Sequence, residues 1–89
     1  MRVELDCARM TGRTETHEYL KEKFSFPEYY GKNLDALYDL LTSVGEAMTI
    51  VLVNRPAAEL NLGGYGSALL ATIREAAEDN PNIDRKSVV

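Results

Sequence analysis

The amino-acid sequence predicts one small α/β domain in which a three-stranded parallel sheet packs against helices. Its 89 residues have the length of a single domain. Apolar, strand-like segments occur near both ends and in the middle of the chain, and segments with helical periodicity separate them. Strands that alternate with helices favour a parallel sheet with right-handed crossovers. We therefore expect residues 1–89 to form one domain whose helices cover mainly one face of the sheet.

The first strand is expected at residues 3–8, where apolar and acidic side chains alternate as in a half-buried strand. The segment TETHEYLKEKF, residues 14–24, predicts a helix because its apolar residues recur at helical spacing. Thr14 or Thr16 would serve as its N-cap, and Pro27 would stop it.

A second helix is predicted to begin directly after Asn33, which is a favourable N-cap residue. At about 100° per residue, four leucines fall on one side of this helix and form its core face. These leucines are Leu34, Leu37, Leu40 and Leu41. Asp35 and Asp39 fall on the opposite side, with Tyr38 at the border, so the two aspartates point at solvent or at a partner.

Residues 48–53, MTIVLV, predict a strand that is either covered on both faces or central in its sheet. A loop that holds a short helix at 57–61 is expected next, and a further helix opens at Gly66 or Ser67. The last strand is expected within NIDRKSVV, residues 82–89, mainly because of its isoleucine and two valines.

Charge and composition point to a basic protein partner in the cytoplasm. The net charge is −4, and residues 25–46 alone carry one lysine against four acidic residues. No Lys/Arg patch of the kind that direct nucleic-acid binding requires is present. No apolar run approaches the roughly 18 residues of a membrane span, and the N-terminus has acidic residues where a secretory signal would be apolar. A single cysteine is unlike a small secreted domain.

No enzyme, metal site or cofactor is predicted. Cys7 and His17 could pair as nucleophile and base, but each falls on an apolar face, which favours a structural role. One cysteine and one histidine give no metal-ligand spacing. The glycine-rich segment at 61–67 lacks the lysine of a phosphate-binding loop. Asp35 and Asp39 could act as acid and base only in a cleft that raised one pKa, and a solvent-facing helix side offers none.

The two aspartates nevertheless need an explanation. Like charges at positions i and i+4 of a helix repel, by about a few tenths of a kcal/mol. The helix dipole favours Asp35 in the first turn but not Asp39 one turn later. Tyr29 and Tyr30 precede this helix and Tyr38 lies beside the carboxylates. Two interpretations stay open from the residues alone: a solvated helix face, or an anchor cluster for a cationic protein surface.

The segment PEYYGKNLDALYDLL, residues 27–41, closely resembles the signature of the barstar family, the intracellular inhibitors of barnase-like ribonucleases. The pattern P-E-Y-Y-G-x-N-L-D-A-L-x-D is long and specific, and the likeness extends over nearly the whole chain, including IREA at 73–76. It implies a barstar-like α/β fold and a free monomer that forms a 1:1 complex with the basic active-site surface of a ribonuclease. The barnase–barstar pair is itself a reference case for charge-steered association and for a dominant interface aspartate.

The resemblance also implies a role for each contact residue. Asp39 would occupy the phosphate site of the nuclease among arginines and the catalytic histidine, Tyr29 would lie against that histidine, and Asp35 would pair with a further basic group. Glu75 would take a second acidic position on the later helix. The full partner-binding set is then Tyr29, Tyr30, Gly31, Asn33, Leu34, Asp35, Tyr38, Asp39, Thr42, Val44 and Glu75.

Several positions depart from the family pattern. Tyr38 and Val44 stand where barstar has tryptophans, its proline before the second strand has no counterpart, and Cys7 is new. These changes suggest a different cognate enzyme, either barnase-like or guanyl-preferring. The alternative is an interaction module of the same fold with a non-nuclease partner, which would leave RNA cleavage running when added to such an enzyme.

Overall fold

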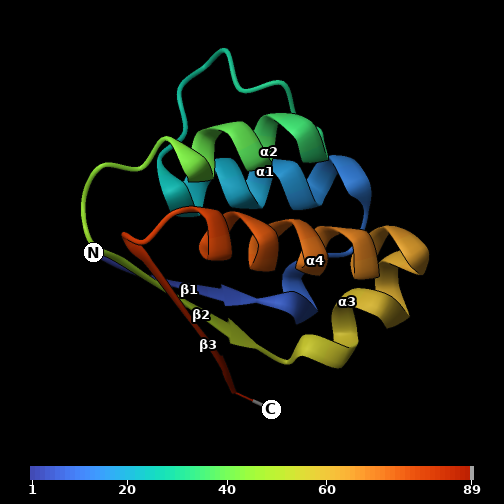
Figure 1. Ribbon diagram of the computed structural model, residues 1–89. Coiled ribbons are helices and arrows are strands. Elements are labelled where there is room, and N and C mark those ends of the chain that lie inside the picture. The colour runs from blue at the N-terminus through green and yellow to red at the C-terminus, as the bar shows by residue number, and fades with distance from the viewer. Residues whose placement is uncertain (89) are drawn as a thin grey trace.

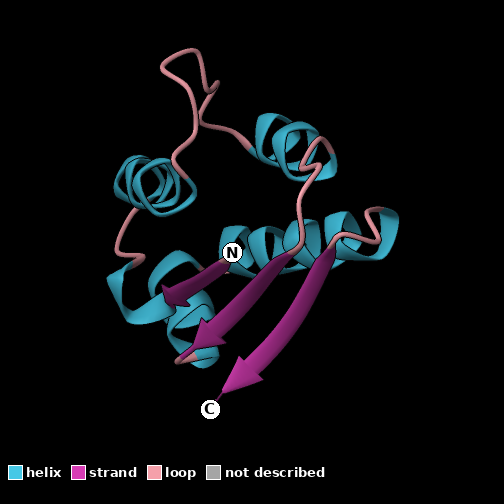
Figure 2. Cartoon of the chain, turned by 90° about the vertical axis from the view of Figure 1, so that its left-hand side faces the viewer, coloured by secondary structure: helices cyan, strands magenta, loops and turns pink. Residues whose placement is uncertain are grey.

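The computed structural model describes residues 1–88 and has the expected order of strands and helices. Its elements are β1 (Arg2–Asp6), a 3-10 turn η1 (Cys7–Arg9), α1 (Arg13–Phe24), α2 (Leu34–Thr42), β2 (Met48–Val53), α3 (Arg55–Leu62), α4 (Gly64–Asp79) and β3 (Ile83–Val88). Helices α1, α2 and α4 lie on one side of the sheet (Figures 1 and 2), as the sequence predicts. The prediction for Val89 falls outside the described residues.

The sheet has the order β1-β2-β3 with both pairs parallel, which confirms the predicted parallel sheet. Strand β2 is central, so of the two readings of MTIVLV the central strand is the correct one. In register, Val3 lies beside Ile50, and both side chains are buried on the helix-facing side. Val51 points to the other face and is still only 2% exposed, and its register partners on the neighbouring strands are Glu4 and Lys86.

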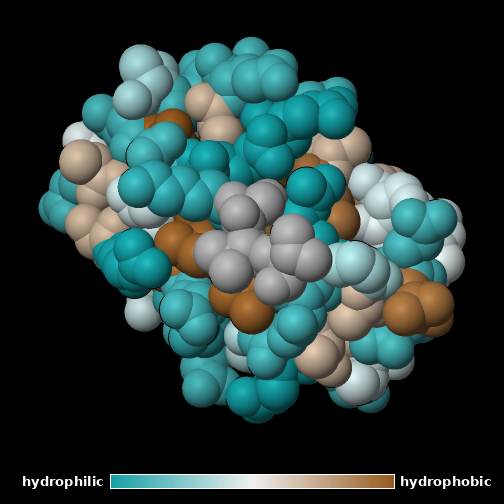
Figure 3. All heavy atoms as spheres, turned by 90° about the horizontal axis from the view of Figure 1, so that it is seen from below, coloured by the Kyte–Doolittle hydropathy of each residue, from teal (hydrophilic) through white to brown (hydrophobic). Residues whose placement is uncertain are grey.

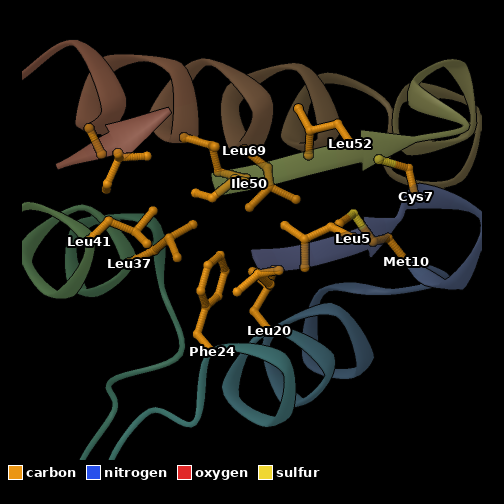
Figure 4. Close-up of a cluster of buried hydrophobic side chains, with 14 of the residues drawn as sticks. Leu5, Cys7, Met10, Leu20, Phe24, Leu37, Leu41, Ile50, Leu52 and Leu69 are labelled. Carbon is orange, nitrogen blue, oxygen red and sulfur yellow. The ribbon is translucent and has the colours of Figure 1, made fainter. Parts of the chain in front are cut away.

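The core lies between the sheet and the three helices that cover it. Figure 4 shows side chains from β1, β2, α1, α2 and α4 pointing toward one another. The predicted leucine stripe of α2 is confirmed, since Leu37 and Leu41 are fully buried and Leu34 and Leu40 are partly buried. Burying one such side chain stabilises the fold by about 1.5–3 kcal/mol. This packing turns the opposite side of α2 toward solvent.

The predicted N-cap of α1 is wrong, whereas its predicted last residue, Phe24, is confirmed. Its N-cap is Gly12, not Thr14 or Thr16, and Thr16 is buried inside the helix. The helix ends at Phe24, before Pro27 is reached, because Ser25 adopts the left-handed conformation with φ of 56°. The backbone N–H of Ser25 then donates to carbonyl groups of the last turn, which satisfies acceptors that the helix end leaves open.

The glycine-rich segment 61–67 is not a loop. Helix α3 extends through Leu62, a single residue, Gly63, breaks the chain direction with φ of 61°, and α4 begins at Gly64. The predicted start of this helix at Gly66 or Ser67 is therefore too late. Gly66 is buried where α4 crosses α3, and a side chain there would meet the backbone of Ala58. The glycine thus allows two helices to approach closely.

The outer face of the sheet has no helical cover in the views of the chain (Figures 1 and 2). Seen from that side, hydrophilic side chains predominate and apolar ones form small separate patches (Figure 3). Among residues 1–88, no helix combines the length and the apolar character that crossing a membrane would require.

Candidate functional site

The start of α2 is fixed by Asn33, as predicted. Its side-chain oxygen accepts a hydrogen bond of 2.7 Å from the backbone N–H of Ala36, and its amide donates to the carbonyl of Gly31 at 3.3 Å. The preceding residue, Lys32, has a positive φ of 55° and turns the chain into the helix. These contacts hold the segment from Tyr29 to Lys32 in a defined position beside the first turn of α2.

Asp35 and Asp39 lie on the exposed face of α2, opposite the buried leucines, as predicted. Within residues 1–88, neither carboxylate forms an ion pair or a hydrogen bond. Two like charges one turn apart, with no compensating partner in the chain, cost about a few tenths of a kcal/mol. Helix α2 therefore carries two exposed carboxylates that have no partner within residues 1–88.

Helix α4 adds acidic residues to the same surface. The hydroxyl of Tyr38 on α2 donates a hydrogen bond to the carboxylate of Asp79 on α4. The pKa of Tyr38 is raised, first by this hydrogen bond, then by partial desolvation and by the nearby charges of Asp79, Glu75 and Asp39. Glu75 is thus close enough to α2 to act on it electrostatically. Asp79 is not among the candidate residues of the sequence analysis. The only sign of it in the sequence is the pair of acidic residues, Glu78 and Asp79, shortly after IREA.

We define the acidic surface as Asp35 and Asp39 of α2 with Glu75 and Asp79 of α4. Asn80, which is only 4% exposed, holds the C-terminal ends of α2 and α4 together. Its amide donates to the carbonyls of Leu41 at 2.9 Å and Val44 at 3.0 Å. Asn80 therefore fixes the end of α4 against the end of α2 and keeps the two halves of the acidic surface in register.

The two tyrosines before α2 point in opposite directions. Tyr29 is 81% exposed. Tyr30 is only 4% exposed, so the expectation that it adds aromatic area to the binding surface is wrong. Its ring packs against Phe26 at 4.8 Å between centroids, and its hydroxyl is 2.6 Å from Nδ1 of His17. Tyr30 anchors the turn from within, and of the two tyrosines only Tyr29 is exposed.

His17 has the predicted structural role. Its side chain is 1% exposed, and its second ring nitrogen, Nε2, is 2.6 Å from the hydroxyl of Tyr65. Both nitrogens are occupied by tyrosines, so neither is available as a base for Cys7. Cys7 is itself fully buried, and burial raises the pKa of its thiol, which disfavours the reactive thiolate. Residues 1–88 contain no cluster of ligand side chains that could hold a metal ion.

The geometry agrees with what comparison with known proteins finds. The family model described as "Barstar (barnase inhibitor)" matches residues 1–88. The chain belongs to the barstar family. A protein of Bacillus subtilis (strain 168) named "Putative ribonuclease inhibitor YrdF" is 47% identical over 64 residues, which are 71% of this chain and 70% of that protein. Membership confirms the resemblance, and it places the chain among inhibitors, not enzymes.

Four further positions of the expected contact set lie in α2 or close to its ends. The Thr42 hydroxyl donates to the Tyr38 carbonyl at 2.8 Å, so it is engaged within the helix. Val44 and Leu34 pack partly against the core. Gly31 has little room for a side chain, because a Cβ there would lie 3.3 Å from both Ala36 and Asn33. Because Tyr38 and Val44 replace two tryptophans of barstar, this member of the family has less aromatic side-chain area at these two positions.

Mild acid is expected to destabilise this barstar-family fold through His17. Burial lowers the pKa of His17 below its ordinary value of 6.5, so the unfolded chain binds the proton more readily than the folded one. The free energy of unfolding should be highest above the unfolded pKa and should fall as pH drops from about 7 to about 5, above the range where most carboxylates titrate. Urea unfolding across this range measures it.

His17→Gln provides the control, because glutamine can hydrogen-bond to a tyrosine but does not titrate. The variant should lose stability at neutral pH but show a flatter dependence on pH. An equally steep dependence in the variant would show that some other group is responsible.

Proposed function

We propose that this chain inhibits a small barnase-like or guanyl-preferring microbial ribonuclease by covering its active site with α2 and the exposed Tyr29. The proposal extends the ribonuclease-inhibitor role that the family and the Bacillus subtilis relative support. The observation that carries it is the pair of exposed carboxylates, Asp35 and Asp39, which have no partner among residues 1–88.

Asp39 is the anchor of the proposed contact. A ribonuclease that binds the RNA backbone offers arginines and a protonated histidine where the phosphate sits. A carboxylate in that position takes the place of the phosphate and accepts charge-assisted hydrogen bonds, which are about twice as strong as neutral ones. Asp39 would lie at this phosphate site, and Asp35 would pair with a neighbouring basic side chain of the enzyme. Inhibition is then competitive with RNA.

The acidic surface also accounts for partner choice. Asp35, Asp39, Glu75 and Asp79 come from two helices and are exposed on one side of the molecule. A surface of one charge attracts a basic partner over a distance of about 10 Å at moderate salt. Such attraction mainly raises the association rate. Binding should therefore slow as salt is increased, with a smaller change in the dissociation rate.

A titration of RNA cleavage tests the proposal. Increasing amounts of the chain are added to barnase and, separately, to a guanyl-specific relative, and cleavage of a fluorogenic RNA is followed. We expect cleavage to fall to zero near equimolar amounts for one of the two enzymes, and excess RNA to relieve the inhibition. Cleavage that continues undiminished with both enzymes would favour the alternative of a partner that is not a nuclease.

A further inference from the structure

A pocket of about 420 Å³ adjoins the acidic surface at the start of α2. Arg13 and Thr14 of α1, Asn33 and Asp35 at the start of α2, and Tyr65 at the start of α4 line it. Asn33 and Asp35 also belong to the expected contact set, so the pocket continues the surface that would face the ribonuclease. Neither Arg13 nor Tyr65 is part of that set, and no pattern in the sequence indicates that these two residues meet.

Arg13 is held in a defined orientation. Its guanidinium lies over the Tyr65 ring, 4.1 Å from the centroid, and the Tyr65 hydroxyl is bound to the buried His17. Among residues 1–88, Arg13 makes no ion pair. A guanidinium that lies over a ring and makes no ion pair has N–H groups available, and these match a carboxylate in a two-point contact.

The other polar groups of the pocket are mainly donors. The Thr14 hydroxyl is a possible donor, and one N–H of the Asn33 amide remains after its bond to Gly31. The ammonium of Lys32 is nearby but already paired with Glu18. Among residues 1–88, Asp35 is the only acidic residue in the lining. The pocket thus offers an anion site at Arg13 directly beside a cation site at Asp35.

We propose that this pocket receives an aspartate or glutamate side chain of the ribonuclease, which pairs with Arg13. A neighbouring basic side chain of the enzyme would pair with Asp35. This inference rests on the proposed function. A single carboxylate next to a basic side chain suits the pocket, because Arg13 and Asp35 carry opposite charges there. An RNA strand does not, because its phosphates would meet Asp35, Asp39 and a net charge of −4.

The contact would select among ribonucleases. An enzyme with lysine or arginine opposite Arg13 would bring two like charges together in a partly desolvated interface, which costs affinity. Asp39 would supply most of the affinity for any enzyme with a phosphate site, and Arg13 would discriminate between such enzymes.

Charge reversal with a matched control tests this role. Arg13→Glu is compared with Arg9→Glu, because Arg9 also lies over a tyrosine ring, that of Tyr19 at 5.2 Å, but does not line the pocket. Both variants change the net charge equally. We expect Arg13→Glu to weaken inhibition of the cognate ribonuclease about 10-fold or more. Arg9→Glu should leave inhibition unchanged or slightly stronger. Equal effects of the two variants would overturn the proposal.

A charge reversal in the ribonuclease identifies the side chain that pairs with Arg13. Each acidic residue near the enzyme's active site is changed to lysine, and one such change should restore inhibition by the Arg13→Glu variant. Failure of every reversal would overturn the proposal, as would calorimetric binding of inorganic phosphate by the free chain that Arg13→Gln abolishes. If Asp39→Ala weakens inhibition while Arg13→Glu leaves it unchanged, this inference fails and the proposed function stands. If no ribonuclease is inhibited at all, both fail.

Discussion

Replacement of Asp39 by alanine is expected to weaken ribonuclease inhibition by about 100-fold or more while the fold survives. Asp39 is exposed and has no partner within residues 1–88, so its removal takes no contact from the free chain. In the complex, the same change would leave the arginines of the phosphate site desolvated without an anion. Truncating one member of such a pair costs about 2–5 kcal/mol, and 100-fold corresponds to about 2.7 kcal/mol.

Inhibition constants from the RNA cleavage assay measure this effect, with Asp84→Ala as the matched control. Asp84 is also an exposed aspartate, but it lies on β3, away from α2. The two variants change the net charge equally, so the difference between them isolates the local contact. The thermal unfolding midpoint of Asp39→Ala should equal or slightly exceed that of the parent, since a like-charge repulsion is relieved. Undiminished inhibition by Asp39→Ala would remove the proposed anchor.

The sequence predicted the sheet and the position of α2 because local patterns determine both. Alternating or continuous apolar residues mark β1 and β2, and a leucine stripe with an asparagine cap marks α2. Burial of the leucines leaves only one orientation for Asp35 and Asp39. Their exposure therefore followed from the helical periodicity itself.

The supports of the site could not be predicted because they depend on contacts between distant segments. Tyr29 and Tyr30 are neighbours of the same type, and only the packing of the turn against α1 determines which one is buried. Asp79 and Asn80 act on α2 from across a helix–helix contact. No period or spacing in a single sequence records such pairings. Glu75, to which the family resemblance assigns a second acidic position on the later helix, lies in α4.

The glycine-rich segment 61–67 is a second case in which the sequence could not predict a contact between distant segments, and this contact affects stability. Glycine usually indicates a turn, and only Gly63, with its positive φ, meets that expectation here. At Gly66, an added Cβ would lie 2.6 Å from the carbonyl carbon of Ala58, closer still to its oxygen, and 3.0 Å from the nitrogen of Glu59. All three are backbone atoms of α3, so no side chain can rotate away to make room.

Gly66→Ala is therefore expected to lower the free energy of unfolding by about 3 kcal/mol, because α3 and α4 must separate to admit one methyl group. A domain of this size has about 5–10 kcal/mol in total, so the loss would be large. Gly64→Ala is the control, since it lies in the same helix with no atom within 4 Å of its added Cβ. There alanine should be neutral or stabilise by up to about 1 kcal/mol through helix propensity. Urea unfolding of both variants measures the difference, and equal stabilities would mean that α3 and α4 do not pack closely at Gly66.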